Sequence, residues 1–258
     1  MKRLMFFLMI LTFFSGCVKF GEYYAGLTKQ PNISEADVQS GLNVYGIIKT
    51  GPAIDVKNHY FEVQRILFVW GDYDSLYVNN ADVSLTRVPL SGIVENYELK
   101  SGGCTYSNNA IQTAPGDRWF YRCSYDTFIV TASCLVPNEP QLSDLVVRAD
   151  SGLVDLSISP DSTAFMYNVY LLSDSTHSYI EKKIPVKGVE TDYRIKLDWD
   201  IRGKMLVLFV FAYDKNLEKY YTTSNIFFKP NAFRPYFSTV DGGYGTFGAV
   251  SSTMVILQ

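Results

Sequence analysis

Histidine is almost absent from this chain of 258 residues, which contains only His59 and His177. Two histidines so far apart in sequence disfavour a histidine-based acid–base pair and a histidine metal site. The sequence also lacks the GxSxG, HExxH, P-loop and Ser-x-x-Lys motifs, and with them the hydrolase and nucleotide-binding classes that those motifs define. An Asp/Glu pair stays open, because the separation of two carboxylates cannot be read from a sequence. We therefore expect a protein without metal or cofactor and without enzymatic activity.

The chain also has no excess of basic over acidic residues. The chain has 23 Lys and Arg against 26 Asp and Glu, a formal net charge of −3. Binding to phosphate backbones needs a basic surface, so no nucleic-acid partner is expected. The four cysteines include no CxxC pair, which removes the commonest zinc arrangement.

No apolar run at the start of the chain is long enough to span a bilayer as a helix, which takes about 20 residues. The run from Leu4 to Phe14 follows the charged start Met1-Lys2-Arg3 and ends at Ser15-Gly16-Cys17. This layout is typical of a secretory signal, and its end resembles the lipobox of bacterial lipoproteins. We expect residues 1–16 to be removed and Cys17 to carry lipid, with a plain secretory signal as the alternative.

The residues after Cys17 indicate a destination. Val18 and Lys19 follow it, so the Asp that retains many lipoproteins in the inner membrane is absent. Residues 17–40 show no sustained period, and we interpret them as a tether with a short helix near 34–39. The prediction is a lipid-anchored protein of the cell envelope, at the outer membrane.

Three cysteines remain beyond Cys17: Cys104, Cys123 and Cys134. In an exported protein, three cysteines allow one disulfide and leave one thiol. A hairpin turn near Asp126 would pair Cys123 with a residue near Val130, which leaves Cys134 away from Cys123. We therefore favour a disulfide between Cys104 and one of the other two.

The rest of the chain has no long stretch with a helical apolar period, and alternation broken by turn residues predicts an all-β protein. We expect strands at 42–48, 59–70, 81–87, 94–99, 118–125, 128–136, 153–159, 165–173, 179–185, 193–199, 204–213, 219–228 and 249–257. The segment 204–213 is apolar on both faces, so we expect a central strand buried on both sides. Pro137 and Pro140 stiffen a linker between two β-sandwiches, at 41–137 and 138–230, before a glycine-rich C-terminal segment at 231–258.

Two places offer candidate ligand-binding groups. The first is a loop with oxygen-bearing side chains that either bind Ca²⁺ or simply form turns: Asp72, Asp74, Asn79, Asn80 and Asp82. The second is Trp199 between Asp198 and Asp200, which fits a sugar platform or a core residue near a turn.

The glycines Gly243, Gly245 and Gly248 match the dinucleotide fingerprint by letter. That motif needs a following helix and an acidic residue about 20 positions later, whereas a strand is expected here. We interpret the segment as a tight glycine-rich crossing that packs Tyr244 and Phe247 on the sandwich.

Several motifs resemble known β modules. The strand Tyr167–Leu171, with Val210–Asp214 and Tyr220–Asn225 as a closing hairpin, resembles a fibronectin type-III or immunoglobulin-like sandwich. The first half resembles transthyretin-like modules through Ala81–Leu85 and the Pro115-Gly116 turn before Trp119.

From the lipobox to the late glycine-rich segment, the chain resembles the Bacteroidetes-type lipoproteins of domain of unknown function 4249. The motifs are the strand Leu42–Ile48, His59–Ile66, Ala81–Leu85, Pro115-Gly116, Thr131–Pro137 and Gly242–Gly248. This resemblance implies a surface-associated outer-membrane lipoprotein, working beside TonB-dependent barrels, and it implies no catalytic residues.

Taken together, we expect a non-catalytic binding or structural lipoprotein of the envelope. A carbohydrate-binding module is the first alternative, and a hydrolase with an Asp/Glu pair is the second. Coplanar exposed aromatic rings would favour the carbohydrate module. Two facing carboxyl groups, one of them with a raised pKa, would favour the hydrolase.

Overall fold

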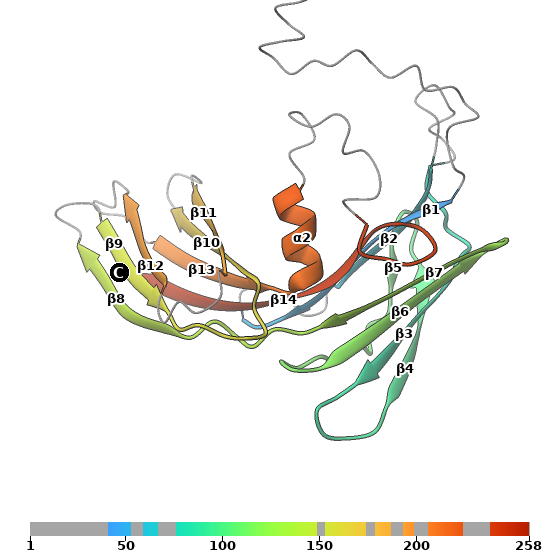
Figure 1. Cartoon of the computed structure of the whole chain (residues 1–258), viewed down its shortest axis with the longest axis horizontal. Helices are drawn as coiled ribbons and strands as arrows, with labels where there is room; N and C mark the ends of the chain where they lie inside the picture. Colours follow the sequence, from blue (N-terminus) through green and yellow to red (C-terminus); the bar gives the residue numbers. More distant parts are fainter. Residues whose placement is uncertain are drawn as a thin grey trace, which may run out of the picture.

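Figure 1 shows the computed structural model, in which strands build nearly the whole molecule and the short helix α2 (Lys215–Thr223) lies on one face of the sheet. The structure describes residues 41–52, 59–66, 76–148, 153–173, 179–186, 193–198, 206–223 and 238–257. The all-β prediction is confirmed. Several predicted features lie outside the described residues: the signal, Cys17, the tether, Asp72, Asp74, His177 and Trp199.

The first half of the chain is a rolled sheet. Its strands are β1 (Leu42–Thr50), β2 (Tyr60–Arg65), β3 (Asp82–Val88), β4 (Glu95–Ser101), β5 (Tyr106–Ser107), β6 (Arg118–Tyr125) and β7 (Phe128–Leu135). The pairing order continues as β1-β2-β5-β4-β3-β6-β7. The sheet then curls back, because Thr131 of β7 exchanges two backbone hydrogen bonds with Asp241, of 3.0 and 2.8 Å.

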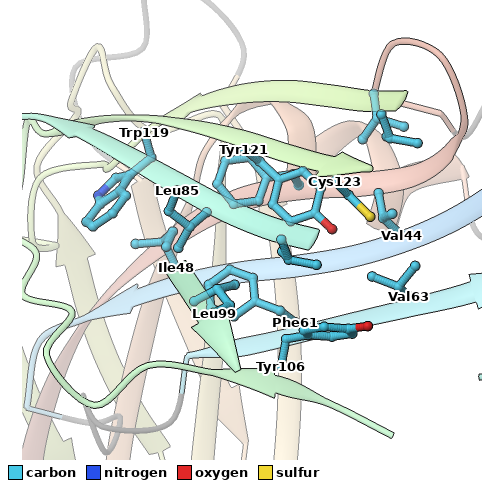
Figure 2. Packing of buried hydrophobic residues seen from close by; sticks show 14 of the residues in the cluster. Val44, Ile48, Phe61, Val63, Leu85, Leu99, Tyr106, Trp119, Tyr121 and Cys123 are labelled. Atoms are coloured by element: carbon cyan, nitrogen blue, oxygen red, sulfur yellow. The ribbon is translucent and has the colours of Figure 1, made fainter. Parts of the chain in front are cut away.

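Alternation along these strands fills the interior of the rolled sheet. In β6, Trp119, Tyr121 and Cys123 are buried, and the residues between them face out. Figure 2 shows these side chains packed with Phe61 from β2 and Tyr106 from β5. The first core is therefore closed by strands from the whole first half.

The second half is a sandwich of two sheets. Its strands are β8 (Leu142–Arg148), β9 (Leu153–Ile158), β10 (Met166–Ser173), β11 (Tyr179–Pro185), β12 (Tyr193–Asp198), β13 (Leu206–Tyr213) and β14 (Tyr244–Leu257). The sheet β12-β9-β8 packs on β11-β10-β13-β14, and Leu156, Val169 and Leu208 are fully or almost fully buried between them. Three strands on four, in this order, make a fibronectin type-III-like sandwich.

Strand β14 belongs to both halves and is not part of a separate C-terminal segment. Its first part runs parallel to β1, from the pair Asn43–Tyr244 onwards. Its last part runs antiparallel to β13, ending at the pair Leu206–Leu257. Phe247 accordingly lies in the first core and Leu257 in the second. The two cores share one long strand.

The prediction of a strand at 219–228 is wrong over 219–223, because Lys215–Thr223 form the helix α2, and 224–228 lie outside the described residues. Asp214 caps this helix, since its side chain accepts a hydrogen bond of 2.9 Å from the backbone N–H of Leu217. The aromatic and β-branched run Tyr220–Thr223 favours a strand by propensity, and the cap with the packing beneath it overrides that preference. The closing strand of the sandwich is β14 instead.

Three smaller predictions also need correction. Strand β8 was not predicted, because a register shift between Ser143 and Val146 breaks its alternation. The two-residue β5 was not predicted either. Strand β13 is central as expected, but one of its faces is only half-buried.

No disulfide joins the cysteines of the described residues, so the expected Cys104 bridge is wrong. Cys123 pairs with Val130 as the hairpin register predicts, and its side chain points into the first core. Cys134 is also buried, whereas Cys104 is exposed in the turn between β4 and β5. Burial raises the pKa of the Cys123 thiol to about 11, so this thiol stays protonated and unreactive.

Candidate functional site: the tyrosine face

Strand β14 joins the two halves into one large sheet. Helix α2 packs on this sheet above β13, β14 and β1, on the face opposite to the one that the three-stranded sheet covers (Figure 1). Leu217 is buried against Ile47 and Val250. The amide of Asn216 donates to the backbone oxygens of Ser133 and Phe247, each at 2.8 Å. These contacts hold the helix on β1 and β14 in the middle of the large sheet and tie it to β7 at one edge.

Helix α2 can approach β14 closely because Gly248 of that strand has no side chain. A Cβ atom at this position would lie 2.5 Å from Cγ of Leu217 and 2.7 Å from a carboxylate oxygen of Asp214. Gly248, the last glycine of the match to the dinucleotide fingerprint, is therefore explained by the packing of α2 on β14. The expected packing of Phe247 is also found, since its ring centroid lies 5.2 Å from that of Tyr121.

Six tyrosines gather around α2, and we call this surface the tyrosine face: Tyr45, Tyr60, Tyr170, Tyr213, Tyr220 and Tyr221. They come from β1, β2, β10, β13 and α2, and each is half-buried. The face thus joins both halves of the chain.

The rings of the tyrosine face pack edge to face or tilted. The ring of Tyr45 lies 5.7 Å from Tyr60 at 67° and 5.6 Å from Tyr220 at 52°. The ring of Tyr221 lies 5.3 Å from Tyr213, and its hydroxyl lies 3.0 Å from that of Tyr45. Such pairs contribute beyond their buried area, so the rings hold one another in place.

A polar cluster borders the rings on β10 and β11. Asn168 and Tyr170 both donate to Oε1 of Glu181, each at 2.8 Å. Lys183 lies 3.5 Å from the same carboxylate, and its ammonium stands 5.6 Å from the centre of the Tyr221 ring. Burial opposes ionisation of Glu181, but these hydrogen bonds and Lys183 lower its pKa.

The pKa values of the phenols do not suit acid–base chemistry at neutral pH. Burial raises the pKa of Tyr45, Tyr170 and Tyr213 well above the usual phenol value. The hydrogen bond to Glu62 is the main cause that raises the pKa of Tyr60 to about 12. The face therefore presents neutral phenols beside a carboxylate and an ammonium group.

Acid–base candidates elsewhere in the described ranges have structural roles. Burial raises the pKa of Asp214 to about 7, yet its oxygens accept hydrogen bonds from the backbone and cap α2. Burial lowers the pKa of His59 to about 4, and its Nδ1 accepts from the backbone N–H of Lys49 at 3.1 Å.

A shallow groove where the two halves meet contains Glu139 and Asp161. The Asp161 carboxylate accepts from Asn138 at 2.8 Å and from the backbone of Thr163 at 2.7 Å. These bonds lower its pKa against the effect of burial. A general acid needs a raised pKa, so Asp161 does not supply one.

The structure describes only part of the predicted ligand loop. Asn79, Asn80 and Asp82 are exposed where the chain enters β3, while Asp72, Asp74 and Trp199 lie outside the described residues. Within the described ranges, no three His, Cys, Asp or Glu side chains come close enough together to hold a metal ion.

The tyrosine face was missed by sequence reasoning. Its members lie up to 176 residues apart, as for Tyr45 and Tyr221, and no local pattern connects them. The one available signal was Asp214, a helix-capping residue three positions before Leu217.

Comparisons with known proteins give fold-level likenesses only. No family model and no curated protein matches the chain. Among solved structures it is similar to a two-domain fibronectin type-III segment of chicken tenascin, with 13% identity, 85% of this chain and 98% of that chain covered, and a TM-score of 0.28. It is also similar to the FN1–FN3 domains of chicken CNTN1, with 10% identity, 84% and 63% covered, and a TM-score of 0.26.

The strand order, and not these low scores, defines the second half as a fibronectin type-III-like sandwich. Many binding and structural modules of cell surfaces use this architecture. In the part of the chain that the structure describes, no helix is long and apolar enough to cross a membrane.

Proposed function

We propose that this chain is a non-catalytic binding module of the bacterial cell envelope. In this proposal a lipid on Cys17 anchors it at the outer membrane, and the tyrosine face binds an envelope protein. Membership of the family catalogued as domain of unknown function 4249, and work beside a TonB-dependent barrel, are part of the same proposal.

The tyrosine face is the observation that supports the binding role. Tyrosine is enriched in protein interfaces, where its ring supplies contact area and its hydroxyl supplies a hydrogen bond. Here the rings are already packed on a sheet and on one another, so binding would immobilise few additional side chains. Glu181 and Lys183 at the border add charges that select a complementary partner.

The carbohydrate alternative is less well supported by the same surface. A flat sugar stacks best on an exposed coplanar platform, whereas the rings around Tyr45 stand at 67° and 52° to it. The face is therefore uneven, which suits the side chains of a protein partner.

Site-specific photocrosslinking in the native envelope tests the proposal. A photoreactive phenylalanine analogue at Tyr60 or Tyr220 should give one discrete crosslinked product, because both positions belong to the tyrosine face. The control is the same analogue at Val146, which is exposed on β8 in the opposite sheet. Equal products from all three positions, or none from Tyr60 and Tyr220, would contradict binding through this face. Intact-mass analysis of the same protein reports the lipid on Cys17 separately.

A further inference from the structure

The loop between β3 and β4 carries the most exposed aliphatic side chains of the described residues. Leu90 is 81% exposed and Ile93 is 86% exposed, and Val88 and Val94 flank them at 36% and 51%. We call residues 88–94 the hairpin tip. In Figure 1 it is the outermost part of a hairpin that projects from the lower edge of the molecule. Exposed apolar clusters of this kind mark interaction sites.

The hairpin tip is held outward by the structure beneath it. Arg87 binds the buried carboxylate of Asp117 at 2.7 Å and Glu95 at 3.1 Å, which joins both strands of the hairpin to the turn before β6. Leu90 rests against Gly116 of that turn, since a Cβ at position 116 would lie 2.4 Å from the Leu90 side chain. The aliphatic side chains are therefore presented on a braced support.

The composition of the tip favours lipid over protein. Four of the exposed side chains of the tip are aliphatic, and the fifth is the small Ser91, whereas protein interfaces are enriched in Tyr, Trp and Arg. The exposed Arg118 is the cross-strand partner of Val88, which places a cation directly behind the apolar group. Aliphatic side chains ahead of a basic residue match the acyl chains and phosphates of a bilayer surface.

We propose that the hairpin tip inserts into the acyl-chain boundary of a lipid bilayer, with Arg118 at the headgroup phosphates. Insertion is shallow, because the backbone of an irregular loop keeps its hydrogen bonds only near water. Leu90 and Ile93 enter furthest, and Val88 and Val94 stay at the boundary.

A lipid on Cys17 and the hairpin tip would be separate membrane contacts in the chain. Position 17 is 24 residues before Gly41, and a chain of that length spans at most about 86 Å. One lipid-anchored site and one inserting hairpin would then hold the protein by two independent contacts, which membrane anchoring commonly requires. This combination rests on the proposed anchor, but insertion of the tip does not.

A fluorophore at the tip tests the insertion. The full-length protein carries Cys17→Ser, which removes the proposed lipid attachment, Cys104→Ser, which removes the exposed thiol, and Ser91→Cys labelled with the environment-sensitive dye NBD. Cys123 and Cys134 are buried and stay unlabelled. The matched control carries the label at Thr127→Cys in the turn between β6 and β7. Vesicles consist of phosphatidylethanolamine with phosphatidylglycerol, or of phosphatidylcholine alone.

We expect a blue-shifted emission at position 91 and quenching by brominated acyl chains, with neither effect at position 127. Replacing both Leu90 and Ile93 by Ser should raise the lipid concentration at which half of this signal is reached by at least about tenfold. Arg118→Gln should weaken the signal more on vesicles that contain the anionic phosphatidylglycerol than on phosphatidylcholine alone. An unshifted label at position 91, an equal shift at position 127, or a shift that needs added envelope protein would overturn the proposal.

Discussion

Gly245→Ala is expected to unfold both halves of the protein together. Gly245 lies in β14 at a φ of +102°, and a Cβ there would be 1.9 Å from the backbone oxygen of Val44. Backbone atoms cannot move aside as a flexible side chain can, so the pairing of β14 with β1 must break. We expect a loss of more than about 4 kcal/mol in the free energy of unfolding.

Hydrogen exchange read by mass spectrometry measures this effect in both halves. Protection should fall in β6 of the first core and in β9 of the second, because β14 completes both. The control is Gly103→Ala, at a φ of +92° with no atom within 4 Å of the added Cβ. It should cost about 1 kcal/mol, the conformational strain alone. Full protection in β9 of the Gly245→Ala protein would show that the halves are stabilised separately.

Asp214→Asn is expected to change the pH dependence of stability more than any other single substitution in the described residues. Burial raises the pKa of Asp214 to about 7, although the backbone N–H groups of Leu217, Ala249 and Asn216 favour its ionised form. A carboxyl group whose pKa is higher in the folded than in the unfolded protein binds more protons when folded. Stability then falls as pH rises from about 4 to about 7, and the contribution is at most about 4 kcal/mol.

Asparagine keeps an oxygen for the N–H of Leu217 and removes the ionisation, so the helix cap remains. Urea unfolding of both proteins from pH 4 to pH 8 measures the difference. The variant should gain stability relative to the wild type as pH rises, and the ring contacts of α2 should be retained at pH 8. Parallel pH profiles would show that folding does not raise the pKa of Asp214.

The strands that alternate regularly were predictable from the sequence alone. The predicted and observed bounds agree for β6 (Arg118–Tyr125) and for β11 (Tyr179–Pro185). In β6 every second residue is buried, so the period of two follows directly from which face meets the core. The same reasoning fails for β8, where the register shift after Ser143 breaks the period.

Other features depend on contacts between distant parts of the chain. Helix α2 has a strand-like sequence in Tyr220–Thr223 and depends on Asp214 and on burial of Leu217. The sharing of β14 depends on pairing with β1, some 200 residues earlier. The tyrosine face depends on both, since it needs the helix in place and the two halves side by side. Local propensity carries no information about any of these.

Crosslinked affinity purification of the tagged protein from its native envelope is the most direct test of the central claim. The wild type should recover an envelope protein in stoichiometric amount. The double variant Tyr60→Ala and Tyr220→Ala should recover at least about tenfold less of this partner than the wild type does. A double variant of the hairpin tip, Leu90→Ser and Ile93→Ser, is the control and should retain the partner. Recovery of the protein alone, or equal recovery from the tyrosine variant, would contradict binding of an envelope protein through the tyrosine face.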